Sequence, residues 1–183
     1  ERQAPEKGAL YATQYASQLV QDGKQNEAIN VLGRFGGDPD DSNFILYKGL
    51  IKEFFGRTLK QTSVQGGGND IVSLTKDLRK LIYSLVQSLK GGDSGGGSKY
   101  EGKTSNSSSS QGALKFFERA LLVAHYMTMQ KEFEENGNSK EAAQIAVALL
   151  RFCGVIPADR AFYEAGIACR DTNDLSMAFV FLN

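Results

Sequence analysis

The chain of 183 residues has no tryptophan, one histidine, two cysteines and three prolines, and its 21 basic residues balance 21 acidic ones. The zero net charge argues against a nucleic-acid-binding protein that works by neutralising phosphates. A metal site of histidine and cysteine ligands would need nearly every candidate in the chain. No apolar run approaches the roughly 20 residues that cross a bilayer, so we expect no stable membrane insertion. These scarcities favour a non-enzymatic protein without catalytic, cofactor-binding or metal-binding residues.

The two cysteines, Cys153 and Cys169, lie in apolar helical sequence, and we interpret them as reduced core thiols. The sequence has no initiating methionine, and its last helical segment is apolar without a polar tail. These features lead us to expect an internal piece of a longer protein.

Helical periodicity runs through almost the whole sequence. Apolar residues recur three and four positions apart, and turn residues separate the segments. No stretch alternates with a period of two for long enough to form a strand, so we predict an all-α protein. The expected helices are residues 9–21, about 25–36, 42–56, 70–90, 113–135, 139–153, 158–171 and 174–183.

A segment poor in apolar residues interrupts this pattern. Of the 22 residues in 91–112, 14 are glycine or serine. Such a composition offers no apolar surface to offset the chain entropy lost on ordering, so we predict a flexible insertion. The chain then divides into helix pairs in 1–90, the insertion at 91–112, and truncated helix pairs in 113–183.

Two helix pairs, one near each end of the chain, share one spacing. The distance from the opening residue to an alanine in the second helix is 16 residues in both, from Ala12 to Ala28 and from Phe162 to Ala178. This is the rhythm of tetratricopeptide repeats, whose helix pairs stack into a solenoid. The shared pattern is Ala12-x2-Tyr15-Ala16-x2-Leu19 with Ala28-x3-Leu32, and Phe162-x2-Ala165-Gly166-x2-Cys169 with Ala178-x3-Leu182.

Small residues in this pattern are the candidate structural sites. Ala16 and Gly166 are expected to let the partner helix approach closely, and Ala28 and Ala178 to lie at the crossing on that partner. A bulky residue at Gly166 should therefore destabilise the last pair. The helices at 42–56, 70–90 and 113–153 match the repeat poorly, so we expect degenerate repeats; the alternative is a compact helical bundle without repeats.

Several local motifs suggest chemistry but have simpler explanations. Residues 97–104 satisfy the phosphate-loop pattern GxxxxGK[ST], yet no strand precedes them and no helix follows, so we interpret the match as chance. His125 lacks a second histidine and is interpreted as a hydrogen-bonded helix residue. The helix at 70–90 carries Lys76, Arg79, Lys80 and Lys90 opposite its apolar stripe. That pattern occurs in membrane-surface helices and calmodulin targets, but in a helical array it usually marks one core face and one solvated face.

The sequence also resembles a known family. Residues 157–168 and 173–183 resemble the late solenoid of the intraflagellar transport protein 172 family, as do residues 117–126 ahead of them. Residues 15–24 with 26–28 are similar too, although any tetratricopeptide could share them. The resemblance is weak over 57–90 and absent over 91–112.

The resemblance implies a scaffold in a large hetero-oligomeric ciliary assembly. Members of this family are peripheral IFT-B subunits of the trains that carry cargo along the axoneme, with a C-terminal half associated with IFT-A. The expected partners are therefore other IFT-B subunits and IFT-A, and the expected location is the cytoplasmic side of the cilium or flagellum and basal body. The alternative is a tetratricopeptide adaptor that binds short linear motifs of cargo. The first helix offers only Gln14, Gln18 and Gln21 for such a groove, with no cation to clamp a carboxylate.

Overall fold

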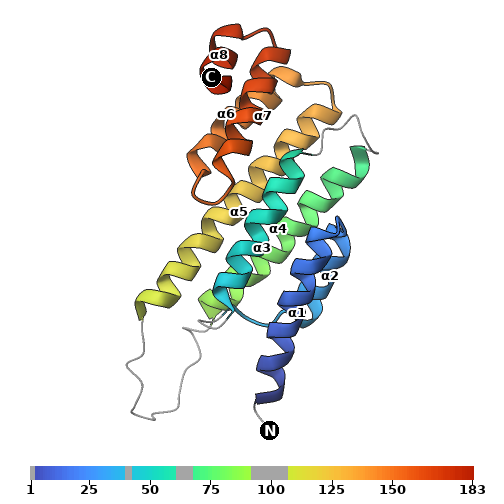
Figure 1. Ribbon diagram of the computed structural model, residues 1–183, viewed down its shortest axis with the longest axis vertical. Coiled ribbons are helices and arrows are strands. Elements are labelled where there is room, and N and C mark those ends of the chain that lie inside the picture. Colours follow the sequence, from blue (N-terminus) through green and yellow to red (C-terminus); the bar gives the residue numbers. More distant parts are fainter. Residues whose placement is uncertain (1–2, 40–42, 61–67, 92–106) are drawn as a thin grey trace. The chain divides into compact units, whose positions relative to one another are not determined.

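The computed structural model describes residues 3–39, 43–60, 68–91 and 107–183. Throughout these ranges the regular structure is helical and no strand is found, so the all-α prediction is confirmed (Figure 1). The helices are α1 (Gln3–Gln21), α2 (Gln25–Phe35), α3 (Phe44–Lys60), α4 (Gly68–Gly91), α5 (Ser107–Glu135), α6 (Ser139–Leu149), the short 3₁₀ turn η1 (Leu150–Phe152), α7 (Ala158–Asp171) and α8 (Leu175–Leu182).

The predicted insertion at 91–112 lies largely outside the described residues, and so does the phosphate-loop match at 97–104. Helix α5 begins at Ser107 rather than at 113, so the end of the expected insertion is helical. Helix α6 ends at Leu149, earlier than expected, because the chain tightens into η1 before the turn at Gly154.

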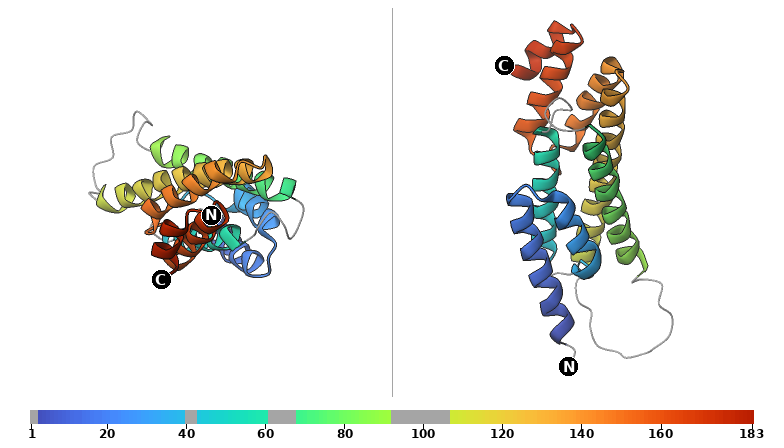
Figure 2. Two further views of the ribbon diagram at one scale, coloured as in Figure 1. Left: turned by 90° about the horizontal axis from the view of Figure 1, so that it is seen from above. Right: turned by 90° about the vertical axis from the view of Figure 1, so that its right-hand side faces the viewer.

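The chain forms two compact units. Unit 1 comprises Glu1–Leu50 and Lys80–Arg119, and unit 2 comprises Ile51–Arg79 and Ala120–Asn183. In unit 1, α1 and α2 lie side by side and antiparallel (Figure 2). In unit 2, α7 packs against both α6 and α8. Adjacent helices therefore pack in pairs, as a helical repeat protein requires.

One turn joins the helices of each pair. In α1–α2, Gly23 adopts a left-handed φ of +81°, its N–H donates to the Val20 carbonyl at 3.1 Å, and the Lys24 N–H donates to the Leu19 carbonyl at 2.8 Å. These two bonds satisfy carbonyls that the end of a helix leaves without partners. The turn reverses the chain within three residues, so the second helix returns along the first.

The same turn closes α5 and α7. Gly137 has a φ of +74° and Asn173 a φ of +63°, and the residue after each donates back to the helix, from Asn138 to Phe133 and from Asp174 to Cys169, both at 2.8 Å. The pair α5–α6 is thus built on the same plan as α1–α2 and α7–α8. The sequence analysis placed this third pair among the degenerate repeats.

An alanine lies four residues after each turn, and the residue 12 positions before that alanine distinguishes the third pair from the other two. Ala28, Ala142 and Ala178 are all buried. The N–H of each donates to the backbone carbonyl of the residue just before the second helix. In the outer pairs a small residue, Ala16 or Gly166, lies 12 positions earlier. In α5–α6 that position holds Gln130, a long residue that departs from the repeat and is nevertheless 97% buried.

The core of unit 1 is an aromatic cluster around Tyr47 of α3. The Tyr47 ring is fully buried and packs edge to face on Phe117 of α5, with the two ring centroids 6.1 Å apart. The Phe44 ring packs edge to face on Phe116 and Phe117. The Tyr47 hydroxyl donates to the Gly37 carbonyl at 3.1 Å, where Gly37 has a left-handed φ of +65°. Tyr47 therefore attaches the chain after α2 to the packing of α3 on α5.

Removing this hydroxyl should weaken unit 1. We expect Tyr47→Phe to lower the free energy of unfolding by about 0.5–1.5 kcal/mol, because the ring packing stays and the Gly37 carbonyl loses a buried donor. Chemical denaturation monitored by circular dichroism measures the difference. An exposed tyrosine of α4, Tyr83→Phe, is the matched control and should change nothing. Equal stability of Tyr47→Phe and wild type would show that the bond contributes no net stability.

The crossing of α7 and α8 makes a second prediction. A Cβ atom added to Gly166 would lie 2.5 Å from Leu182 Cγ and 3.3 Å from Phe181 Cβ, whereas one added to the exposed Gly49 of α3 would meet nothing within 4 Å. Gly166→Leu should therefore destabilise the protein by about 1–3 kcal/mol through overpacking. Gly49→Leu, the control, should be neutral or slightly stabilising because leucine favours a helix over glycine. An unchanged melting temperature in Gly166→Leu would show that α7 and α8 do not need a glycine where they cross.

Candidate protein-interaction surfaces

The small residues proposed at helix crossings all lie inside the units. Ala16 and Ala28 are completely buried in the α1–α2 pair, and Gly166 and Ala178 are buried in the α7–α8 pair. Gly166 directly faces Leu182 and Phe181 of α8. We propose that these four residues set the closest approach of their helices.

His125 of α5 and the basic residues of α4 contact each other or neighbouring residues within the chain. Arg79 Nη1 and His125 Nδ1 lie 3.2 Å apart, and because a guanidinium can only donate, the ring nitrogen is the acceptor. The prediction of a hydrogen-bonded helix histidine is confirmed. Lys76 and Lys90 of α4 pair with Glu132 and Glu118 of α5 at 2.7 and 2.9 Å. Lys76, Arg79 and Lys90 of α4 therefore lie along α5, as expected for a solvated face beside a core face.

The two thiols do not form a pair, and both are free. Cys169 is buried and Cys153 is half-buried. Burial raises the pKa of both thiols, and the Asp174 carboxylate raises that of Cys169 further. Both are therefore less ionised at neutral pH than an exposed cysteine, which makes them weak nucleophiles. Across the described part of the chain no group of three or more histidine, cysteine, aspartate or glutamate residues is placed to hold a metal ion.

A buried charged group lies between α5 and α7. Lys131 is 97% buried, and its Nζ pairs with Glu134 Oε2 at 2.9 Å. Gln130 Nε2 donates to the other oxygen of Glu134 at 2.9 Å. Glu164 of α7 interacts with both charges, since Lys131 lowers its pKa and Glu134 raises it. Burial has the largest effect, and the pKa of Glu164 is raised overall.

Unit 1 exposes an apolar hollow between α1 and α2, which we call the α1–α2 hollow. It has a volume of about 570 Å³ and no charged residue in its lining. Tyr11, Tyr15 and Phe35 stand around it and are 57–67% exposed. The residues that line it are Gly8, Ala9, Tyr11, Ala12, Tyr15, Val31 and Phe35.

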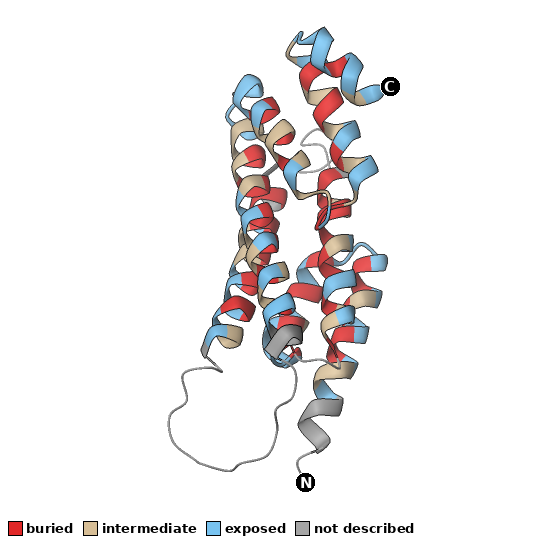
Figure 3. Ribbon diagram, turned by 90° about the vertical axis from the view of Figure 1, so that its left-hand side faces the viewer, coloured by how far each residue is buried: buried red, intermediate tan, exposed pale blue. Residues whose placement is uncertain are grey.

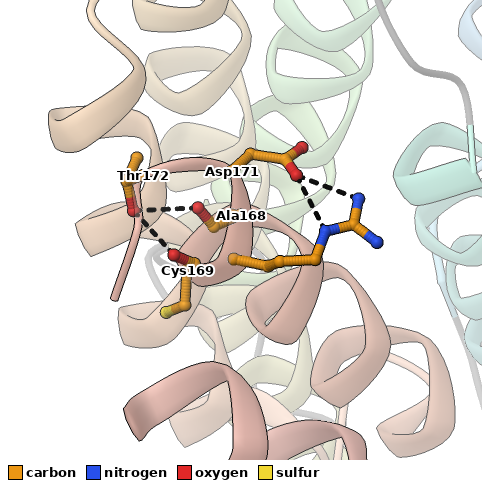
Figure 4. Close-up of polar contacts among 5 residues, drawn as sticks. Ala168, Cys169, Asp171 and Thr172 are labelled. Carbon is orange, nitrogen blue, oxygen red and sulfur yellow. Dashed lines mark hydrogen bonds and ion pairs between the residues drawn. The ribbon is translucent and has the colours of Figure 1, made fainter. Parts of the chain in front are cut away.

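Unit 2 exposes a mixed aromatic and basic face on α7, which we call the α7 face. It consists of Arg160, Tyr163, Ile167 and Arg170, which recur three and four positions apart and so share one side of the helix. Tyr163 is half exposed, and the Arg170 side chain is 55% exposed. The Arg170 guanidinium donates twice to Asp171 Oδ1, at 2.9 and 3.0 Å, while Thr172 Oγ1 donates to the Ala168 and Cys169 carbonyls (Figure 4).

Unit 2 also exposes an apolar stripe on α8, which we call the α8 ridge. Leu175, Phe179 and Leu182 recur at positions i, i+4 and i+7 and are 63, 69 and 42% exposed. Neighbouring Val180 is 66% exposed, and Ala178 is the one buried residue of this helix. Figure 3 shows α8 coloured as exposed over most of its length. A helix that is apolar all round is normally covered.

Curated proteins from several organisms are similar to this chain in sequence. The chain is 33% identical over 183 residues, its whole length, to intraflagellar transport protein 172 of Chlamydomonas reinhardtii. It is 29% identical over 174 residues to the homolog of Danio rerio, and 28% identical over 175 residues to that of Mus musculus. This chain is homologous to a segment of intraflagellar transport protein 172. It spans 9% of the length of each of these relatives.

The similarity to intraflagellar transport protein 172 confirms the family resemblance inferred from residues 113–183 and 9–56. The aligned length with the Chlamydomonas protein also includes 91–112, where we saw no resemblance in the sequence itself. No protein-family model matches the chain. None of the helices in the described ranges is long and apolar enough to cross a membrane.

The raised pKa of Glu164 predicts a pH dependence of stability. The folded state binds the Glu164 proton more tightly than the unfolded state does. The contribution of Glu164 to the free energy of unfolding is therefore fully present in acid, and it is lost as the pH rises from the ordinary glutamate pKa through the raised one. Glu164→Gln, which stays neutral, should therefore gain in melting temperature relative to wild type as the pH rises from about 4 to about 7.

Thermal unfolding at a series of pH values measures this difference. Glu141→Gln on the exposed side of α6 is the control, and its difference from wild type should not follow the same course. A Glu164→Gln advantage that stays constant or shrinks with rising pH would contradict the effect of burial on this carboxyl group.

Proposed function

We propose that this chain is a scaffold segment of an intraflagellar transport subunit, making protein contacts within IFT-B and to IFT-A during ciliary transport. The observation that carries the proposal is the homology of the whole chain to proteins named intraflagellar transport protein 172. The paired helices support it, because stacked pairs offer long surfaces to partner subunits without any reacting group. The proposed location is the cytoplasmic side of the cilium or flagellum and its basal body.

The α7 face is the proposed contact with a partner subunit. Tyrosine and arginine are enriched among residues that dominate binding energy, because one side chain combines a large contact area with directed hydrogen bonds. Tyr163 lies between Arg160 and Arg170 on this face, and Asp159 and Asp171 beside the two arginines balance their charge. The face therefore suits a partner surface that combines apolar and polar groups.

The adaptor alternative has weaker support. Gln14, Gln18 and Gln21 are exposed on α1, and Gln18 is already hydrogen-bonded to Asp22 at 3.0 Å. None of the three carries the positive charge that grips the carboxylate of a peptide. A short-motif adaptor is therefore kept only as an outcome of the experiment.

Affinity capture from ciliary extract tests the proposal. Wild-type chain, washed at moderate salt, should recover other transport subunits identified by mass spectrometry. The double variant Tyr163→Ala with Arg170→Ala should recover them about tenfold less, which corresponds to roughly 1.4 kcal/mol of binding energy. The control pairs Tyr83→Ala with Arg119→Ala, which are exposed on α4 and α5 of unit 1, and should match wild type.

Each contrary result has a distinct meaning. Recovery of no transport subunit by folded wild-type chain would contradict the scaffold function. Recovery of unrelated proteins that share a short motif would favour the adaptor. Full recovery by the α7 variant would place the contact elsewhere on the chain. Circular dichroism of every variant shows whether a loss reflects binding rather than folding.

A further inference from the structure

Four polar side chains of unit 2 form a group between α5 and α7, which we call the α5–α7 cluster. Its members are Gln130, Lys131 and Glu134 of α5 and Glu164 of α7. Gln130 and Lys131 are each 97% buried, and the Glu134 side chain is 25% exposed. Neighbouring pairs of a helical repeat usually bury a continuous apolar core between them. Charged groups placed there are costly unless each one is paired.

The α5–α7 cluster contains one cation for two carboxylates. Lys131 Nζ lies 2.9 Å from Glu134 Oε2, and Gln130 Nε2 donates to Glu134 Oε1 at 2.9 Å, so both oxygens of Glu134 are occupied. Glu164 experiences the charges of Lys131 and Glu134, yet it forms no hydrogen bond or ion pair within the described residues. One positive and two negative charges leave the ionised cluster with a net charge of −1.

The surroundings of Glu164 do not balance this excess of negative charge. Lys131 is the one buried charged residue in the described ranges. Arg160, one turn earlier on α7, has the smallest effect of the three charges that act on the pKa of Glu164. Its side chain is 40% exposed and lies 3.8 Å from the Asp159 carboxylate. Helix α8 carries no charged residue. The charged residues of α6 and η1 are all exposed: Lys140, Glu141 and Arg151.

A proton on Glu164 corrects the cluster in two ways. It brings the net charge of the cluster to zero, so that the single ion pair of Lys131 and Glu134 is balanced. It also gives Glu164 an O–H group that can donate a hydrogen bond. The cluster is short of donors, because Gln130 Oε1 is buried and accepts no hydrogen bond within the described residues. Both effects stabilise the packing of α7 on α5 when the proton is bound.

We propose that the α5–α7 cluster is a proton-sensitive contact between neighbouring helix pairs, closed when Glu164 is protonated and opening locally more often when Glu164 is ionised. Each pair of a helical repeat contacts only its neighbours, so one contact can weaken while the other pairs stay folded. The proposal therefore concerns the local opening of α7, whereas the melting experiment on Glu164→Gln concerns the unfolding of the whole chain.

The direction of the pH effect follows from where the proton binds more tightly. Burial raises the pKa of Glu164 in the closed contact, whereas in the open state the carboxyl group is in water and titrates with its ordinary pKa. Closure is therefore favoured in acid and is weakened as the pH rises from the ordinary glutamate pKa through the raised one. Above the raised pKa the opening should no longer change with pH.

Hydrogen exchange of the backbone amides tests the proposal. NMR spectra of the purified chain from about pH 4 to about pH 7 give a protection factor for each amide, after division by its intrinsic exchange rate. In wild type the α7 amides should lose protection as the pH rises, by about tenfold for each unit by which the pKa of Glu164 is raised. The amides of α1 and α2 in unit 1 should keep theirs.

Two variants examine the cluster itself. Glu164→Gln cannot ionise, so its α7 amides should keep constant protection over the same range. Glu134→Gln leaves Glu164 as the one carboxylate beside Lys131, so the loss of protection in α7 should be smaller than in wild type. Glu135→Gln removes the same charge from the exposed neighbouring position on α5 and should behave like wild type. If Glu134→Gln fails to fold by circular dichroism, the comparison of Glu164→Gln with Glu135→Gln decides the test.

Three results would overturn the proposal. Constant or rising protection of the α7 amides in wild type would show that ionisation of Glu164 does not open the contact. An equal loss in α1 and α2 would show that the chain unfolds as a whole and that no local opening exists. A loss of protection that persists in Glu164→Gln would assign the pH effect to another group. Because these measurements need no partner protein, the proposal and the scaffold function fail independently.

Discussion

The close approach of paired helices at a buried small residue is the constraint on which both units depend. Gly23 and Asn173 reverse the chain in the left-handed conformation, so the second helix begins within three residues of the end of the first. Ala16 and Gly166 then leave room for that helix to lie against the first. We expect a larger residue at these positions to push the helices apart and to weaken the apolar contacts on either side, because those contacts depend on the same distance.

The pair α5–α6 shows what happens when the small residue is replaced. Gln130 lies at the corresponding position, is buried, and donates to Glu134, while its Oε1 finds no partner within the described residues. A buried polar side chain needs hydrogen-bond partners, and the groups around Gln130 are charged. Lys131 pairs with Glu134, and both charges act on Glu164 of α7. Unit 2 therefore combines a close approach of α7 and α8 at Gly166 with a partly buried ionic group between α5 and α7, and only the ionic group predicts a pH dependence of stability.

Tyrosine side chains lie in three different environments in this chain. Tyr47 is enclosed by α5 and binds the Gly37 carbonyl, so it stabilises the fold. Tyr163 is exposed on α7 between Arg160 and Arg170, where we propose a partner contact. Tyr15 is exposed at the edge of the α1–α2 hollow. Burial by neighbouring helices, rather than residue type, separates a core aromatic from a binding one.

The sequence by itself determined the helices and the two outer pairs, because a helix repeats every 3.6 residues and its turns carry glycine or asparagine. The role of the four small residues at helix crossings stays a prediction. The sequence also indicated the homology to a segment of intraflagellar transport protein 172, since residues 117–126, 157–168 and 173–183 carry the resemblance that the comparisons confirm. It marked the third pair only as a degenerate repeat, because Gln130 stands where the outer pairs have a small residue. Only the tertiary structure decided that Tyr47 is core while Tyr11, Phe35 and Tyr163 are exposed. The reason is physical: periodicity is a property of one helix, whereas burial depends on residues brought against it from distant parts of the chain.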